Sequence, residues 1–273
     1  MLEPRYVPAG DARRRFALAP GALAGRVVAV SGASGGLGTA LCHALGAAGA
    51  TLALIGRSER KLDRLYDALV AAGTPTPAIV PLAQETAGEA AYAELAGLLA
   101  AELGGLDALV HASAAYTVPT PLGAVSQEDW ARVHNVNVAA ARLATLACLP
   151  LLVESSLASV TFLLDHRPGA YWGAYGVSKQ GVHALMHMLA DESDGRRDDD
   201  DHPRLAVNGY DPGPMRTPLR RRFFPGELER ESPPPETRLG PLLWLIAREE
   251  RALTGTALRH GADEAEPARE RTA

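Results

Sequence analysis

Tyr175 and Lys179 stand four residues apart in a stretch with helical character, and this pair of residue types can carry out acid–base chemistry. Val177, Leu185 and Met188 recur there at intervals typical of a buried helical stripe. Helical residues four apart lie on one face, so the phenol and the ammonium group are expected side by side. A positive charge beside a phenol lowers its pKa from about 10 toward neutrality. Tyr175 is therefore predicted to exchange a proton near neutral pH.

The use of lysine supports a functional role for this pair. The chain contains 27 basic residues, and only Lys61 and Lys179 are lysines. A compact ammonium group and a planar guanidinium group are not interchangeable, so a lysine kept beside Tyr175 favours a chemical role. The alternative is an ordinary amphipathic helix in which the pair arose by chance, and the other motifs decide between the two.

A glycine-rich turn follows a short β-branched run at residues 26–31 and precedes a stretch with helical periodicity. Glycines at such a turn let a pyrophosphate approach the backbone and the N-terminus of the helix. The sequence therefore predicts a dinucleotide site here. The residues predicted to line it are Ser31, Gly32, Ser34, Gly36, Leu37 and Gly38.

The end of the next predicted strand, residues 51–56, indicates which dinucleotide binds. An NAD site has a carboxylate about 20 residues after the glycines, where it binds the ribose 2′-hydroxyl. Here Gly56 is followed by Arg57, with no acid. An arginine suits the 2′-phosphate of NADP through charge-assisted hydrogen bonds. NADP is therefore the predicted cofactor, and NAD is less favoured.

Strands and helices alternate along the chain, which predicts an α/β fold: a single-domain Rossmann-type, doubly wound parallel β-sheet with helices on both faces. This domain is expected to span residues 25–261. Residues 1–24 are expected to form an irregular surface arm, and residues 262–273 a charged, disordered tail. The predicted strands span residues 26–31, 51–56, 77–82, 108–111, 159–164, 204–210 and 254–258, and the predicted helices include 60–72, 86–103, 126–133, 138–153, 175–192 and 240–251.

Composition excludes several classes of function. The net charge of −5, without a lysine-rich patch, argues against a nucleic-acid partner. Cys42 and Cys148 lie in apolar helical stretches and are expected to be packed thiols in a reducing compartment. The arginines at 13–15 are followed by only a short, broken apolar stretch, which does not fit a signal peptide. The apolar run 138–153 is expected to be too short to span a membrane. A cytoplasmic protein with a small-molecule partner is predicted.

Together these motifs resemble the short-chain dehydrogenase/reductase family, from about Gly25 to Gly261. The sequence Ser-Gly-x-x-x-Gly-x-Gly at 31–38 resembles the family's Thr-Gly-x-x-x-Gly-x-Gly turn, and Tyr175 and Lys179 match its catalytic pair. The Trp-Gly-Ala before the tyrosine is similar to a subgroup of bacterial oxidoreductases. The resemblance implies hydride exchange between a nicotinamide and a carbonyl or secondary-alcohol substrate.

The resemblance also implies roles for residues outside the helix. Asn137 matches an asparagine that holds a water relaying protons to the lysine. Pro212-Gly213-x-x-x-Thr217 matches the segment that contacts the nicotinamide, and Ala112 lies in the family's cofactor-contacting turn after the fourth strand. Members commonly form homodimers or homotetramers through the helices that correspond to 138–153 and 175–192.

One departure from the family pattern lies close to Tyr175. The family places a serine about 13 residues before the tyrosine, and with a connection about three residues shorter Asp165 falls at that position. A carboxylate there would raise the Tyr175 pKa, against the action of Lys179. A protonated Asp165 could instead donate a hydrogen bond, as could His166, or neither side chain faces the site.

Other positions also differ from the family. The Asn-Asn-Ala-Gly turn is His111-Ala-Ser-Ala114, Pro81 replaces an acid, and Asp211 replaces an asparagine. These changes suggest weakened or altered catalysis. Two hypotheses follow: an NADP-dependent oxidoreductase, or a dinucleotide-binding protein with little or no catalysis that acts as a sensor or interaction module.

Four further features carry weaker predictions. His183 and His187 have a spacing that could bind a metal, but the His-Glu-x-x-His pattern is absent and no metal is predicted. The acidic stretch 193–202 is expected to be a solvated loop. Arg220–Arg222 could attract an anionic substrate, form a solvated face or contact the acidic loop. The segment 214–240 has the length of a lid, beneath or within which its two phenylalanines would pack.

Overall fold

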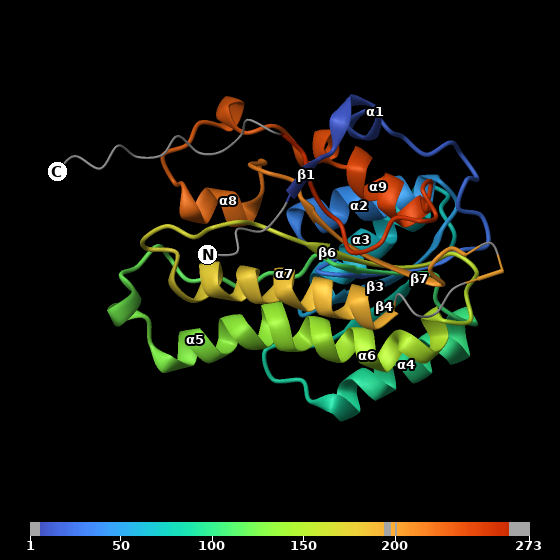
Figure 1. The fold of residues 1–273 in the computed structure, drawn as a ribbon, viewed down its shortest axis with the longest axis horizontal. Helices are drawn as coiled ribbons and strands as arrows, with labels where there is room; N and C mark the ends of the chain where they lie inside the picture. Colours follow the sequence, from blue (N-terminus) through green and yellow to red (C-terminus); the bar gives the residue numbers. More distant parts are fainter. Residues whose placement is uncertain (1–5, 194–197, 200, 262–273) are drawn as a thin grey trace.

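The computed structural model describes residues 6–193, 198–199 and 201–261, and these form one parallel sheet with helices on both faces (Figure 1). The strand order is β1-β8-β7-β6-β5-β2-β3-β4. The predicted Rossmann-type fold is confirmed. The strands are β1 Tyr6–Pro8, β2 Val27–Ser31, β3 Thr51–Gly56, β4 Ala78–Pro81, β5 Ala108–His111, β6 Ala158–Leu163, β7 Leu205–Asp211 and β8 Ala257–Arg259.

Two layers of helices enclose the sheet. The α-helices are α1 Gly10–Arg14, α2 Gly36–Ala47, α3 Glu59–Ala71, α4 Glu89–Leu103, α5 Gln127–His134, α6 Ala140–Leu152, α7 Gly173–Ser193, α8 Pro218–Phe223 and α9 Gly240–Ala247. Helices α4, α6 and α7 cover one face around Phe162 and Met186, whereas α2, α3 and α9 cover the other around Leu41 and Leu54 (Figure 1). Shorter 3-10 turns lie at Leu122–Ala124, Glu229–Glu231 and Pro235–Arg238.

The central strands are buried on both faces, which explains their continuous apolar runs in the sequence. All five residues of β2 and all six of β6 are buried. The order of the strands reverses between β2 and β5, which pair in parallel with Ser31 opposite His111. In open α/β sheets, ligands bind beyond the carboxyl ends of the strands at such a reversal. The fold therefore places a binding site where β2 and β5 end.

Helices α5 and α6 join through a π-helical turn, Asn135–Ala139, into one continuous helix of 26 residues, Gln127–Leu152. Among the described residues it is the one helix long and apolar enough to cross a membrane by length and composition, because it extends the shorter apolar run 138–153 back to Gln127. Of its most apolar window, 44% is buried inside the protein. Its inward side packs against the sheet and α4, and we interpret it as a core helix.

The N-terminal arm was predicted to be irregular, and this is wrong for residues 6–14. They form strand β1 and helix α1. Strand β1 pairs in parallel with β8, with Tyr6 opposite Ala257, and the Ala9 amide donates to the Arg259 carbonyl at 2.8 Å. Pro8 is tolerated because β1 is an edge strand. The arm thus covers the edge that β8 would otherwise expose. The tail 262–273 and part of the acidic stretch 193–202 lie outside the described residues.

Tyr6 fastens the arm to the domain, and replacing it with alanine is expected to lower the free energy of unfolding by about 1–2 kcal/mol. The Arg259 guanidinium lies 3.9 Å from the centre of the Tyr6 ring, and the His183 ring packs against it at 5.5 Å. Urea unfolding measures the change. Tyr6→Phe keeps the ring and is expected to match the wild type, as is alanine at the exposed Val7. An unchanged stability in Tyr6→Ala would contradict this role.

Candidate active site

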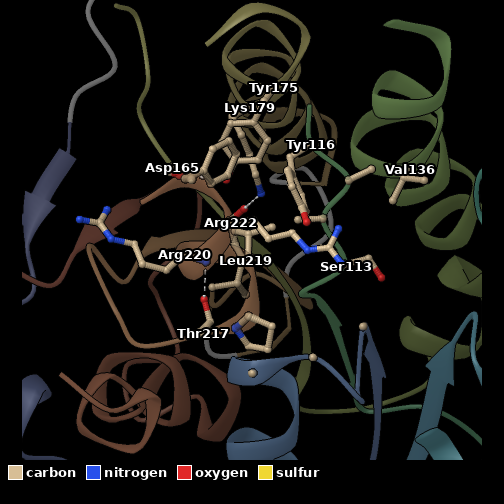
Figure 2. Close-up of a pocket in the computed structure, with 18 of the residues that line it drawn as sticks. Ser113, Tyr116, Val136, Asp165, Tyr175, Lys179, Thr217, Leu219, Arg220 and Arg222 are labelled. Atoms are coloured by element: carbon tan, nitrogen blue, oxygen red, sulfur yellow. Dashed lines mark hydrogen bonds between the residues drawn. The ribbon is translucent and has the colours of Figure 1, made fainter. Parts of the chain in front are cut away.

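A cleft of about 880 Å³ lies at the carboxyl ends of the strands, between the glycine-rich turn and α8 (Figure 2). It brings together most of the residues singled out from the sequence. Those that line it are Gly32, Ser34, Gly36, Leu37, Gly38, Arg57, Ala112, Asp165, Tyr175, Lys179, Pro212, Gly213 and Thr217.

Ser31 and Asn137 lie behind the wall of this cleft. They line a small cavity of about 10 Å³, together with Lys179 and His111. This volume is close to the smallest that holds one water molecule, and its polar lining could bond one. The cavity therefore connects the two predicted residues to the site through Lys179 rather than directly.

The glycine-rich turn is packed too closely for side chains, so its backbone lines the cleft directly. A Cβ on Gly32, whose φ is +72°, would lie 2.7 Å from the Ser113 amide nitrogen. A Cβ on Gly36 would lie 2.7 Å from Thr217 Cγ2, and one on Gly38 would collide with the Gly32 carbonyl. The N-terminus of α2 directs its unpaired amides toward the same space. The turn fits the group that the sequence predicts.

The far end of the cleft is basic. Arg57 and Lys61 line it beside the hydroxyl groups of Ser34 and Ser58. Arg57 forms an ion pair with Glu85 at 3.3 Å, but its side chain is 71% exposed, so the pair is weak. Sequence reasoning missed Lys61 as a site residue. Its rarity was the signal, because both lysines of the chain line the cleft.

Asp165 occupies the position next to the Tyr175 hydroxyl. The Tyr175 hydroxyl donates a hydrogen bond to Asp165 Oδ2 at 2.8 Å, and Arg167 Nε forms an ion pair with Asp165 Oδ1 at 2.8 Å. The Arg167 guanidinium also lies 4.8 Å from the centre of a Trp172 ring. His166 instead lies beside Gln180, with Nδ1 2.8 Å from the amide nitrogen. Of the two residues weighed from the sequence, Asp165 is the one that contacts Tyr175.

The Tyr175 pKa is raised well above its ordinary value, first by burial and then by the Asp165 carboxylate, while Arg167 opposes the rise. Tyr175 is only 2% exposed. The prediction that Lys179 brings this pKa toward neutrality is wrong here. Lys179 Nζ donates to the Leu163 carbonyl at 2.9 Å and lies 5.9 Å from the centre of the Tyr175 ring. Burial lowers the Lys179 pKa.

Asn137 joins the loop after β5 to the first turn of α7. Its Oδ1 accepts from the Ala115 amide at 2.7 Å, and its Nδ2 donates to the Ala115 carbonyl at 2.9 Å and to Ser178 Oγ at 2.8 Å. Ser178 Oγ in turn donates to the Tyr175 carbonyl at 2.8 Å. The Asn137 side chain therefore positions the backbone at Tyr175. Its predicted part in a proton relay stays a prediction.

Asp211 orders the segment predicted to contact the nicotinamide. Its Oδ1 accepts from the Gly213 amide at 2.9 Å, and its Oδ2 forms an ion pair with Arg259 Nε at 3.2 Å. Burial raises the Asp211 pKa, and Asp165 adds to the rise. Farther along, Thr217 caps α8, because its Oγ1 accepts from the Arg220 amide at 3.1 Å.

Helix α8 and the chain after it close one side of the cleft, as a lid would. Arg220 forms a two-point ion pair with Glu227, at 2.9 and 2.8 Å, and lines the cleft with Arg222. The Phe223 ring packs beneath the lid near Tyr175, with ring centres 5.3 Å apart. Among the described residues, no group of three metal-binding side chains is found.

Comparisons with known proteins agree with this architecture. A family model described as short chain dehydrogenase matches residues 26–228, from β2 through α8. The uncharacterized oxidoreductase YciK of Escherichia coli K12 is 31% identical over 233 residues, which cover 84% of this chain and 89% of YciK.

Solved structures extend the likeness to three dimensions. A protein from Pseudomonas syringae shares 37% identity and a TM-score of 0.84, covering 89% of this chain and 98% of its own. A protein from Escherichia coli CFT073, determined in complex with NADPH, shares 30% identity and a TM-score of 0.82, covering 88% of this chain and 98% of its own. This chain belongs to the short chain dehydrogenase family and resembles its bacterial YciK-like oxidoreductases.

Proposed function

We propose that the protein is an NADP(H)-dependent oxidoreductase that reduces the carbonyl group of a small molecule to a secondary or primary alcohol, and that can run the reverse reaction. The observation that carries this proposal is the buried Tyr175 hydroxyl, which opens on the cleft while bonded to Asp165. When bound, NADPH would supply the hydride, and the residues of the chain would orient it and handle the proton.

Support for NADP comes from the two ends of the cleft. The glycine-rich turn lines the cleft at the N-terminus of α2, where a diphosphate would bind, and Arg57 and Lys61 offer positive charge where a 2′-phosphate would lie. The Escherichia coli CFT073 relative was determined in complex with NADPH. Lys179, in the wall of the cleft beside Tyr175, would hold the nicotinamide ribose.

Tyr175 would act as the acid of the reduction. Because burial and Asp165 raise its pKa, the phenol keeps its proton at neutral pH and can deliver it to the substrate oxygen. Asp165 uses one carboxyl oxygen to accept from the Tyr175 hydroxyl and the other to pair with Arg167, so it would not bind the carbonyl oxygen as the family's serine does. Its role would be to hold the Tyr175 hydroxyl in place, with Arg167 balancing its charge.

Proton resupply would run through the small cavity behind the site. Lys179 and Asn137 both line this cavity, whose volume suits a single water molecule. A water there would accept a hydrogen bond from the Lys179 ammonium group.

The second candidate is a dinucleotide-binding protein with little or no catalysis. It is favoured by the same contact, because the Tyr175 proton points at Asp165 rather than at the open cleft. A substrate must break that hydrogen bond before it receives the proton. Efficient turnover of any carbonyl compound would exclude this candidate.

Cofactor choice can be tested at Arg57. Arg57→Ala is expected to raise the KM for NADPH about tenfold and to leave the KM for NADH nearly unchanged, because only NADPH carries the 2′-phosphate. Steady-state kinetics with both cofactors measures the difference. Arg60→Ala, which removes the same charge from an exposed position outside the cleft, is the matched control. Equal effects of Arg57→Ala on both cofactors would contradict the assignment.

A further inference from the structure

Aromatic side chains from three separate segments meet beside Tyr175. The Phe223 ring lies 5.0 Å from Tyr116, 4.9 Å from Trp172 and 5.3 Å from Tyr175, centre to centre. These distances are typical of favourable aromatic pairs. Tyr116 follows β5, Trp172 precedes α7, and Phe223 ends α8. Figure 2 shows Tyr116 and Tyr175 projecting into the same cleft above the residues of α8.

Phe223 fills a slot lined by the rings of Tyr116, Trp172 and Tyr175. Its ring is tilted by 55° against each of these three rings. An aromatic ring in this slot would make the same tilted contacts and would lie against the Tyr175 ring. The slot is therefore located where the reacting end of a substrate must lie.

The segment that carries Phe223 lies at the surface of the protein. All six residues of α8 keep some exposure to solvent. Arg220 and Glu227 form a two-point ion pair within the segment, and the Arg222 guanidinium lies 5.9 Å from the centre of the Tyr116 ring. Thr217, which belongs to the same segment, caps the first turn of α8. Phe223 is half-buried and lies outside the two main hydrophobic clusters, so a displacement of its ring opens neither of them.

We propose that the substrate is an aromatic carbonyl compound whose ring takes the place of the Phe223 ring between Tyr116 and Trp172. This inference rests on the proposed function, and it names the substrate class of the same site. One aromatic ring would replace another, so the contacts with Tyr116 and Trp172 would be kept while the carbonyl carbon lies beside Tyr175. A saturated ring is thicker and lacks the polarised face that these contacts use.

Two aldehydes of similar size test the substrate class: benzaldehyde, which is planar, and cyclohexanecarbaldehyde, which is not. With NADPH, the wild type is expected to favour benzaldehyde by about tenfold in kcat/KM. Conjugation makes benzaldehyde the less electrophilic of the two, so a preference for it reports on binding. Equal use of both aldehydes, or a preference for the saturated one, would overturn the inference.

Variants at Tyr116 show whether the slot is responsible. Tyr116→Leu removes one aromatic face and is expected to abolish most of the preference, whereas Tyr116→Phe keeps the ring and should retain it. The ratio between the two aldehydes is the readout, because a general structural defect would lower both rates together. An unchanged ratio in Tyr116→Leu would overturn the assignment.

Binding without turnover separates this inference from the proposed function. Benzyl alcohol is expected to quench the fluorescence of Trp172, and the quenching should disappear in Trp172→Phe and weaken in Tyr116→Leu. If benzyl alcohol binds in this way but no aldehyde is reduced, the slot stands and the proposed function fails. If aliphatic aldehydes alone are reduced, the proposed function stands and the aromatic substrate class fails.

Discussion

Tyr175→Phe is expected to lower the rate of NADPH-dependent carbonyl reduction by about two to four orders of magnitude. The substitution removes one oxygen atom and keeps the ring that packs against Trp172 and Phe223. The lost group is the hydroxyl that bonds to Asp165 and faces the cleft. Without it no side chain delivers a proton at that position as the alkoxide forms. The substitution should leave the cleft and its cofactor contacts in place.

The measurement compares initial rates for wild type and variant with the same aldehyde, and follows NADPH binding separately through the cofactor's fluorescence. Binding is expected to be retained. Tyr171→Phe removes a hydroxyl from an exposed neighbour outside the cleft and should behave as wild type. Turnover that survives in Tyr175→Phe would remove Tyr175 from the role assigned to it.

Asp165→Ser is expected to shift the pH dependence of the reaction to lower pH. A general acid works in its protonated form, so reduction is at full rate below the Tyr175 pKa and is lost as pH rises through it. Burial and then Asp165 raise that pKa, which places the alkaline loss of wild-type activity above pH 10. Removing the carboxylate lowers the Tyr175 pKa, because the nearby Arg167 cation, which also lowers it, is then no longer opposed by Asp165. The alkaline loss should therefore begin at lower pH in the variant.

The reverse reaction gives an independent check on the same group. Alcohol oxidation needs the ionised phenol, so Asp165→Ser is expected to oxidise faster than wild type at a given neutral or mildly alkaline pH. The rate of reduction at neutral pH is not expected to rise, because Tyr175 is protonated there in both proteins. Asp129→Asn, which removes a cleft carboxylate paired with Arg132, should leave the pH profile unchanged. A large increase in the rate of carbonyl reduction in Asp165→Ser would contradict the role proposed for Asp165 and would show that its carboxylate hinders catalysis.

Much of the fold could be predicted because the central strands are buried on both faces. Continuous apolar runs such as residues 159–164 have few interpretations other than a parallel strand. Strand β1 escaped prediction for the opposite reason. It has only three residues, ends in Pro8 and pairs with β8 along one side. Its strand conformation therefore depends on a partner far along the chain rather than on its own sequence pattern.

Some features of the site could be predicted from local sequence patterns, whereas others depend on the folded structure. The glycine-rich turn and the Tyr175–Lys179 spacing are local patterns, and both lead to the cleft. The Tyr175 pKa depends on burial and on the hydrogen-bond partner of its hydroxyl. The four-residue spacing between Tyr175 and Lys179 predicts neither. Arg167 and Phe223 were missed as neighbours of the reacting group for the same reason. Arg167 comes from the connection between β6 and α7, and Phe223 comes from α8; neither position belongs to a motif.

Hydride transfer is the central claim, and it can be followed directly with NADPH that carries deuterium at the reactive nicotinamide carbon. The purified protein would be incubated with this cofactor and a set of aromatic and aliphatic aldehydes, and the alcohols analysed by mass spectrometry. The expected result is one deuterium on the carbinol carbon of at least one product, formed about two to four orders of magnitude more slowly with Tyr175→Phe. A protein that binds NADPH but yields no deuterated alcohol from any aldehyde would contradict the account and favour a non-catalytic dinucleotide-binding protein.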